Sequence, residues 1–393
     1  MYRRSGGLGS LLGQMLALVA LIASGFGAFY FLSRADQPGP PPAPQLAPVA
    51  GGVKLGVAYG TEKEAWLRWA AAEFAKTPGG AGVSIDLQPR GSLDAAQALL
   101  SGDRSFQVWA PADSLYIPVL ESAWQAKFGR SPFTRVEHLA MTPMVFVMWE
   151  ERYQAFLRHF PRVSFTTIGE ALAADNWAAL GGRSEWGLFK FAHIHPLTDN
   201  SGLATVVLMA NDVAGTHHAL KTADLGNAHF QAWLRNFEGK AHAVSNGAGR
   251  LIKDLVDQGP SGYDGVFAYE SVVVQELKSA ETKFGRLRVV YPEFNLWNDN
   301  PYCMVAADWV SDGQKQAAQA FLDFLLSEPA QRQALACGLR PVSDKVPAGG
   351  PGSPLVQRRD MGLSLEVGNL CEAPGGEVVS ALLDLWRGLD GQR

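Results

Sequence analysis

Between residues 53 and 129 the sequence repeats one local unit, in which a short apolar run is followed by a turn and then by an amphipathic segment. The apolar runs are VKLGVAYG, VSIDLQPRG and SFQVWAPADS, and the segments that follow them carry apolar residues at helical spacing. Strands that alternate with helices pair in parallel. This alternation predicts an α/β fold, and it returns between residues 141 and 305.

The first 52 residues have a different character. Arg3 and Arg4 precede an uncharged stretch, in which LLGQMLALVALIASGFGAFYFL is long enough to span a bilayer. The two arginines place the N-terminus in the cytoplasm and the remaining chain outside. The following FYFLSRAD is a poor cleavage site, which favours an uncleaved anchor over a cleaved signal peptide. We therefore expect a membrane anchor over 1–33 and, from six prolines in QPGPPPAPQLAP, an extended linker over 34–52.

Composition excludes several classes of function. The net charge of −4 and the lack of a basic block argue against a nucleic-acid partner. Three cysteines, Cys303, Cys337 and Cys371, are too few and too far apart for a zinc cluster. An exported chain allows one disulfide, for which we predict Cys337 with Cys371, while three buried free thiols remain the alternative.

Three strand-to-helix junctions share the same chemistry. They are YGTE (59–62), RGSLD (90–94) and TDNSGL (198–203), and each carries a hydroxyl group where a helix is expected to begin. Ligands of open α/β sheets lie at the carboxyl ends of strands, beside helix N-termini. Thr61 and Ser92 are also good helix N-caps, so one such junction alone is weak evidence. Three of them in one chain predict a binding cleft.

Enzymatic and metal-binding alternatives find little support. The sequence contains no G-x-S-x-G, P-loop or H-E-x-x-H motif, and no base is placed beside Ser201. His193 and His195 share one face of a predicted strand, and His217 and His218 are adjacent, but no third metal ligand at matching spacing accompanies them. We predict no catalytic residue, metal or cofactor.

The order of these elements resembles the bacterial extracellular solute-binding proteins, near the molybdate- and sulfate-binding members. The resemblance lies in VKLGVAYGTEKEAWLRWAAAEFAK, GSLDAAQALLSGDRSFQVWAPADS, TPMVFVMW, HPLTDNSGLAT, YDGVFAYES, VVYPEFNLWNDNPYCMV and AAQAFLDFLLSEPAQRQALACGLRP. It implies a two-lobed periplasmic-binding-protein-like fold, each lobe a mixed or parallel sheet flanked by helices, preceded here by one transmembrane helix. The implied divisions are lobe 1 over 53–143, lobe 2 over 144–297, and the return to lobe 1 with a C-terminal extension over 298–393.

The resemblance also implies positions for ligand contacts. Hydroxyl groups and backbone amides from both lobes would hold a small solute, and Trp297 at the crossover would line the pocket. Asp113 and Glu270 would repel an oxyanion and would suit a cationic or hydroxyl-rich solute. The full predicted set is Gly60, Thr61, Ser92, Ala112, Asp113, Thr198, Asn200, Ser201, Tyr269, Glu270 and Trp297.

Taken with the anchor, the resemblance implies a single-pass protein of the bacterial inner membrane whose globular part lies in the periplasm. It would capture a small polar solute for transport or sensing, without catalysis. Its partners would be the solute, the inner membrane through the N-terminal helix, and an ABC-type transporter or another membrane complex. A membrane-anchored scaffold or signalling domain on the same fold, and a periplasmic hydrolase, are the alternatives.

Overall fold

The computed structural model describes residues 52–245 and 247–390 of the 393-residue chain. The predicted membrane anchor and most of the predicted linker lie outside the described residues. Within the described residues, no helix is both long enough and apolar enough to cross a membrane.

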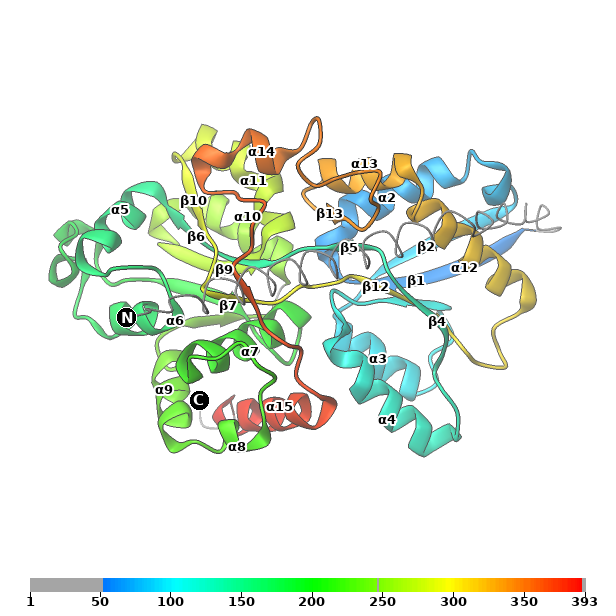
Figure 1. The fold of residues 1–393 in the computed structure, drawn as a ribbon, viewed down its shortest axis with the longest axis horizontal. Coiled ribbons are helices and arrows are strands. Elements are labelled where there is room, and N and C mark those ends of the chain that lie inside the picture. The colour runs from blue at the N-terminus through cyan, green and yellow to red at the C-terminus, as the bar shows by residue number, and fades with distance from the viewer. Residues whose placement is uncertain (1–51, 246, 391–393) are drawn as a thin grey trace, which may run out of the picture. The chain divides into compact units, whose positions relative to one another are not determined.

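The first five-stranded sheet, with its helices, forms lobe 1. Its strand order is β2-β1-β3-β12-β4; β1 pairs in parallel with β2 and β3, and β12 runs antiparallel to β3 and β4. The helices α2 and α12 cover one face, and α3 and α4 cover the other (Figure 1). The strands are β1 (Val53–Tyr59), β2 (Val83–Pro89), β3 (Val108–Ala110), β4 (Phe133–His138) and β12 (Pro301–Val305); the helices are α2 (Glu64–Phe74), α3 (Ser92–Leu100), α4 (Ile117–Phe128), α12 (Asp312–Leu325) and α13 (Glu328–Ala336), with 3-10 turns η1 (Thr61–Lys63), η2 (Pro78–Gly80) and η3 (Ser114–Tyr116).

Alternation along β1 explains how lobe 1 is filled. Leu55, Val57 and Tyr59 point to the core under α2 and α12, whereas Ala58 faces the core under α3. Each of these side chains is at most 1% exposed. A central strand buried on both faces reads as a continuous apolar run, which is the pattern that the sequence shows.

The second five-stranded sheet forms lobe 2. Its order is β10-β6-β9-β7-β8; β7 pairs in parallel with β8 and β9, and β6 runs antiparallel to β9 and β10. The strands are β6 (Met144–Trp149), β7 (Phe191–Ile194), β8 (His242–Val244), β9 (Gly265–Tyr269) and β10 (Leu287–Val290); the helices are α5 (Glu150–His159), α6 (Phe165–Ala173), α7 (Asn200–Ala214), α8 (Thr222–Leu225), α9 (Ala228–Glu238), α10 (Ala248–Gln258) and α11 (Glu270–Lys283), with 3-10 turns η4 (Trp177–Leu180), η5 (Ser184–Trp186) and η6 (Gly259–Ser261).

Two crossing segments connect the lobes, one after β5 (Ala140–Met141) and one between β11 (Phe294–Asn295) and β12. Three buried asparagines join them. The side-chain amides of Asn295, Asn298 and Asn300 donate to the carbonyls of Met144, Thr142 and Ala140, at 2.8, 2.9 and 3.1 Å. Ala140 and Thr142 lie outside the two five-stranded sheets and Met144 begins β6, so these bonds satisfy backbone carbonyls where the chain passes between the lobes.

The C-terminal part returns across both lobes. β13 (Arg340–Pro341) pairs with β5, and β14 (Asn369–Leu370) pairs in parallel with β11. α14 (Pro354–Gln357) and η7 (Arg359–Met361) lie between these strands in the sequence, and α15 (Gly376–Asp390) ends the described chain.

Candidate functional site

The carboxyl ends of β1, β3, β7 and β9 bring polar side chains together between the lobes. These side chains are almost completely removed from solvent, although most of their neighbours along the strands are apolar. Those that are at most 3% exposed include Glu62, Lys63, Asp113, Asn200, Ser201 and Tyr269. Buried polar groups are expensive unless they are paired, so their concentration at this place marks it as the candidate site.

Glu62 and Lys63 form a buried ion pair in η1. The ammonium group of Lys63 also donates to the carbonyls of Ala110 (3.1 Å) and Pro111 (2.9 Å), which end β3. These three acceptors use all three donors of the ammonium group. A Cβ atom on Gly60 would lie 2.4 Å from the Glu62 carboxylate, which explains the glycine at this turn.

Asp113 lies in the turn after β3. Its Oδ1 accepts from the backbone N–H of Leu115 (2.8 Å) and caps η3, whereas its Oδ2 has no hydrogen-bond partner among the described residues. Burial raises the pKa of Asp113 to about 8, and the charges of Asp299 and Glu62 add to the rise. The nearby Asn200 amide opposes it, although the contact between the two side chains falls short of hydrogen-bond geometry. The Asp113 carboxyl is therefore protonated at neutral pH in the structure as described.

Asp199 and Asn200 provide the wall from lobe 2, at the start of α7. Asp199 Oδ1 accepts from the backbone N–H (2.9 Å) and the hydroxyl (2.7 Å) of Ser201, so Asp199 is the N-cap of the helix. Burial, followed by the charge of Glu62, raises the pKa of Asp199. Both polar atoms of the Asn200 side chain are buried and have no hydrogen-bond partner in the described part of the chain.

Three buried tyrosines surround this group. The hydroxyls of Tyr59 and Tyr269 are buried without a hydrogen-bond partner among residues 52–245 and 247–390. Burial, then the charges of Asp113, Asp199 and Glu62, raises the pKa of Tyr269 well above its usual value.

At Tyr59, burial and then the charge of Glu64 raise the pKa to about 12. The third hydroxyl, that of Tyr116 in lobe 1, donates to the carbonyl of Pro196 in lobe 2 (3.0 Å). We call this contact region between the two lobes the seam. The phenols therefore stay protonated, and each of the three is electrostatically coupled to carboxyl groups of the site.

The space around two glycines shows that the lobes meet closely at this seam. A Cβ atom on Gly91 of lobe 1 would lie 2.4 Å from the carbonyl oxygen of Thr198 in lobe 2. A Cβ atom on Gly247 of lobe 2 would lie 3.4 Å from the Thr61 hydroxyl and 3.7 Å from Asp199 Oδ2. The structure is therefore a closed arrangement of the two lobes.

A pocket of about 440 Å³ opens at the edge of the same seam. Lobe 1 contributes Thr61, Glu64 and Arg68, and lobe 2 contributes side chains of α10 and α11. The second group consists of Gly249, Arg250, Lys253, Val272, Gln275 and Glu276. Charged groups of both signs line this pocket, which we call the mouth.

The structure brings some of the sequence-predicted residues to the seam. Thr61 lines the mouth, Asp113, Asn200 and Tyr269 contribute buried polar groups, and Gly60 gives the Glu62 carboxylate its space.

Ser92 and Ala112 hold the lobe 1 turns to each other, since the Ala112 N–H donates to the Ser92 hydroxyl at 3.4 Å. The Thr198 hydroxyl donates to the carbonyl of His195 (3.0 Å), and Ser201 is bonded to Asp199. The predicted N-caps are wrong, because Gly60 and Gly91 precede these helical segments and neither Thr61 nor Ser92 caps them.

Two further predicted residues have partners elsewhere. Glu270 forms a buried, bidentate ion pair with Arg340 (2.8 and 2.7 Å) and also accepts from the Tyr291 hydroxyl. Trp297 packs over the Arg340 guanidinium, 5.4 Å from the ring centre. It lines a different pocket of about 820 Å³ at the crossing segments, together with Met141 and residues of β4.

The sequence analysis did not predict Tyr59, Glu62, Lys63, Tyr116 and Asp199 as part of the site. A signal was present for three of them, because Tyr59 and Glu62 lie within the YGTE junction and Asp199 within TDNSGL. The prediction rested on the hydroxyl groups at those junctions and left out the acidic and aromatic residues beside them.

The cysteines and histidines are placed away from this group. All three thiols are free, so the structure lacks the predicted Cys337–Cys371 disulfide. The alternative of three buried free thiols fits Cys303 and Cys371, whereas Cys337 is only partly buried. Cys337 follows α13, whereas the Cys371 N–H is held by the carbonyl of Asn295 (2.7 Å) at the crossing segment. His193 pairs with Glu238 in the core of lobe 2 (3.1 Å). Within the described ranges, no group of three His, Cys, Asp or Glu side chains is arranged to hold a metal ion.

Comparison with known proteins identifies the fold and the family. The profile of the family described as bacterial extracellular solute-binding protein matches residues 55–340. Among solved structures, the periplasmic thiamin binding protein is 13% identical (TM-score 0.60; 86% of this chain and 96% of that chain), and the sulfate-binding protein SubI from Mycobacterium tuberculosis is 16% identical (TM-score 0.53; 87% and 99%). Iron-bound HitA from Pseudomonas aeruginosa is 15% identical (TM-score 0.55; 86% and 99%).

No curated protein matches the sequence. The solved structures bind different solutes and share only the fold with this chain at such identities. The family match covers most of the globular part, and the two lobes meet at a buried polar seam. The chain therefore belongs to the bacterial extracellular solute-binding proteins, which bind small solutes and work with ABC transporters.

Proposed function

We propose that the solute is a small organic cation and that its charged head binds between Asp113, Asp199 and the hydroxyl of Tyr269. The observation that carries this proposal is an excess of carboxyl groups over ammonium groups at the seam. Glu62 and Asp113 are buried and Asp199 is partly exposed, whereas Lys63 is the one cation among the six buried side chains named above. The charge of Glu62 acts on both Asp113 and Asp199.

Lys63 does not balance this excess. Its three donors are directed to Glu62 and to two backbone carbonyls, so Asp113 and Asp199 face the seam without a cationic hydrogen-bond partner among the described residues. A buried carboxylate without a counter-charge is costly and becomes protonated instead, which is the state that the raised pKa of Asp113 describes. A bound cation replaces that proton and stabilises the ionised form.

The aromatic side chains also favour a cation. Tyr116 and Tyr269 are buried within electrostatic reach of Asp113 and Asp199, and ring faces attract ammonium groups, more strongly when water is excluded. An oxyanion such as sulfate would meet three acidic groups and an ammonium that is already engaged. This contrast separates the proposed solute from that of the sulfate-binding structure.

The mouth supports a solute larger than its charged head. It lies beside Thr61, and the Tyr59 hydroxyl is coupled to Glu64 and Arg68, which line it. A cation whose remaining part is polar would place that part in this pocket. The periplasmic thiamin binding protein shows that the same fold accommodates a solute of this chemical type.

We further propose that residues 1–33 hold the globular part at the inner membrane, in the periplasm, through a single transmembrane helix. The support is the uncharged stretch after Arg3 and Arg4 and the proline-rich segment that follows it. Such tethering would present the loaded protein to an ABC transporter or to another membrane complex.

The experiment is a thermal-shift and calorimetry panel at pH 8 on the globular chain from residue 53. The panel contains thiamine, choline and spermidine as organic cations, sulfate and molybdate as anions, ferric citrate, and a neutral hexose. We expect stabilisation by an organic cation that is lost in Asp113→Asn and kept in Asp308→Asn, a matched change at an exposed aspartate. Stabilisation by sulfate, molybdate or ferric citrate, but by no organic cation, would show that the charge argument is wrong.

A further inference from the structure

The C-terminal helix α15 lies beyond the segment that matches the family, which ends at residue 340. It is amphipathic, with apolar residues recurring every three or four positions. The side chains on its buried face are each at most 7% exposed, and they are Val378, Val379, Leu382, Leu383, Trp386 and Leu389. A buried face of this kind requires partner surfaces along the length of the helix.

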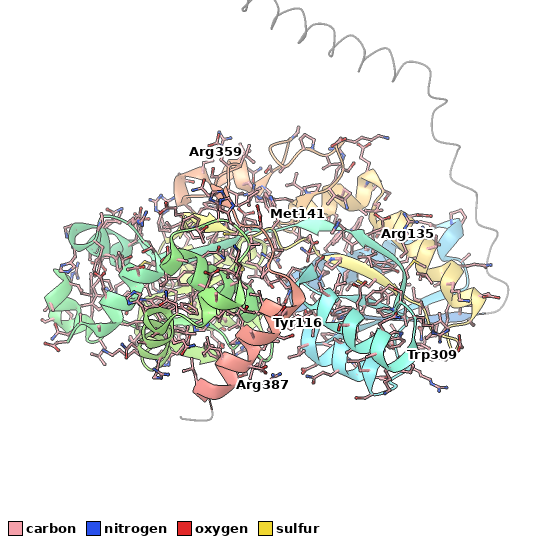
Figure 2. All side chains as sticks on the ribbon, turned by 60° about the horizontal axis from the view of Figure 1, so that its bottom comes forward. Tyr116, Arg135, Met141, Trp309, Arg359 and Arg387 are labelled. Carbon is pink, nitrogen blue, oxygen red and sulfur yellow. The ribbon has the colours of Figure 1, made fainter. Side chains whose placement is uncertain are left out.

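Those partners belong to both lobes. On the lobe 1 side, α15 packs against α4 and η3, and a Cβ atom on Gly376 would lie 3.2 Å from Cβ of Pro118. On the lobe 2 side, it packs against α7 and α8, and the Trp386 ring meets the ring of His195 edge-on at 5.5 Å. Figure 2 shows α15 passing Tyr116 of η3 and continuing to Arg387.

Trp386 also supports the turn that carries the lobe 2 wall of the site. Its indole N–H donates to Nε2 of His195 (3.3 Å). The backbone carbonyl of His195 in turn accepts from the N–H (3.1 Å) and the hydroxyl (3.0 Å) of Thr198, which immediately precedes Asp199. One residue after His195, the carbonyl of Pro196 receives the interlobe hydrogen bond from Tyr116.

We propose that α15 is a latch that holds the two lobes closed and that Trp386 is a positioning residue for the 195–200 turn. Because its buried face spans both lobes, opening of the seam requires α15 to leave one of them. The latch therefore biases the protein toward the closed arrangement and slows the opening through which a solute enters or leaves. The inference concerns the protein without solute, so it can be tested independently of the charge proposed for the solute.

The test uses the full-length protein without solute, as wild type, Trp386→Ala, Trp386→Phe and Asp384→Asn. Asp384 lies on the exposed side of α15 and pairs with Arg387, so its variant is the matched control. Hydrogen exchange is followed in peptides covering 195–201 and in peptides covering the β9 core strand, and the radius of gyration is measured by small-angle X-ray scattering.

We expect Trp386→Ala to raise exchange at 195–201 by at least about tenfold, which corresponds to the loss of one hydrogen bond and its packing, and to increase the radius of gyration. Exchange in β9 should stay unchanged, a selectivity that general destabilisation would not give. Trp386→Phe keeps an aromatic ring, although a smaller one, and loses the N–H donor, so it should give a smaller increase in exchange at 195–201.

Two results would overturn the proposal. One is faster exchange spread equally over 195–201 and β9 without a change in the radius of gyration, which would make α15 an ordinary core helix. The other is a Trp386→Phe protein whose exchange and radius match those of Asp384→Asn, and this second comparison remains decisive if Trp386→Ala does not fold.

Discussion

Replacement of Asp113 by asparagine tests the electrostatic reasoning most directly. An asparagine keeps an Oδ1 acceptor for the Leu115 N–H and resembles the protonated carboxyl in size. It removes the group whose pKa burial raises to about 8, compared with about 3.9 for an ordinary aspartate. At pH 7 the protonated form of Asp113 should outnumber the charged form by about ten to one.

The sign of the pH effect follows from these two pKa values. Between about pH 4 and pH 8 the unfolded chain has released the proton, whereas the folded protein retains it. The stabilisation that Asp113 contributes is therefore complete below about pH 4 and is lost as the pH rises through 8, with a slope of up to about 1.4 kcal/mol per pH unit. The variant lacks this dependence, and the other buried carboxyl groups affect both proteins alike.

The assay is urea denaturation of the wild type and of Asp113→Asn at pH 5, 6, 7, 8 and 9, without solute. The difference in the free energy of unfolding, wild type minus variant, should fall steadily from pH 5 to pH 8 and then level off. A cation that binds the ionised form should bind more tightly as the pH rises, by up to about tenfold per unit below pH 8, with release of one proton. Parallel stability profiles for the two proteins would refute the assignment of a raised pKa to Asp113.

Other changes test the closure, the crossing segments and the thiols. Gly91→Ala places a methyl group 2.4 Å from the Thr198 carbonyl and should hold the lobes apart, which lowers solute affinity by about tenfold or more. Gly79→Ala in η2, whose methyl group would meet its nearest atoms at 3.8 Å, should leave the affinity unchanged; calorimetry and small-angle scattering measure both. Arg340→Met leaves Glu270 buried without its ion pair and should lower the free energy of unfolding by about 3–5 kcal/mol in urea denaturation, and an unchanged midpoint would contradict that role. Ellman's reagent should titrate three thiols in the unfolded, unreduced chain, whereas a disulfide would leave one.

Much of the fold follows from local patterns. The alternation of apolar runs and amphipathic segments predicts strands and helices because β1 and its neighbours are buried on both faces, as in the observed sheets. The junctions quoted from the sequence do lie at the carboxyl ends of β1, β2 and β7, since parallel strands bring those ends to one edge.

Local sequence patterns do not predict which residues far apart in the chain pair with each other. Glu270 looked like a cleft acid because it follows strand β9 directly, but Arg340, seventy positions later, takes both of its oxygens. Trp297 looked like a wall of the solute pocket because it lies at the crossover, yet its ring covers the Arg340 guanidinium and lines a different pocket at the crossing segments. The contacts of α15 with both lobes likewise join segments far apart in the chain.

The sequence by itself determined the kinds of element, their order and the junctions at which ligands of such folds bind, because apolar periodicity and turn chemistry act between neighbouring residues. Only the tertiary structure decided which acidic groups are neutralised and which remain without a counter-charge. Burial and the distance to an opposite charge set the pKa of a carboxyl group, and both are properties of the folded chain. Asp113 and Glu270 are both acidic side chains that follow a strand. Glu270 is paired with Arg340 and belongs to an internal ion pair, whereas the pKa of Asp113 is raised by burial, which makes Asp113 the candidate ligand group.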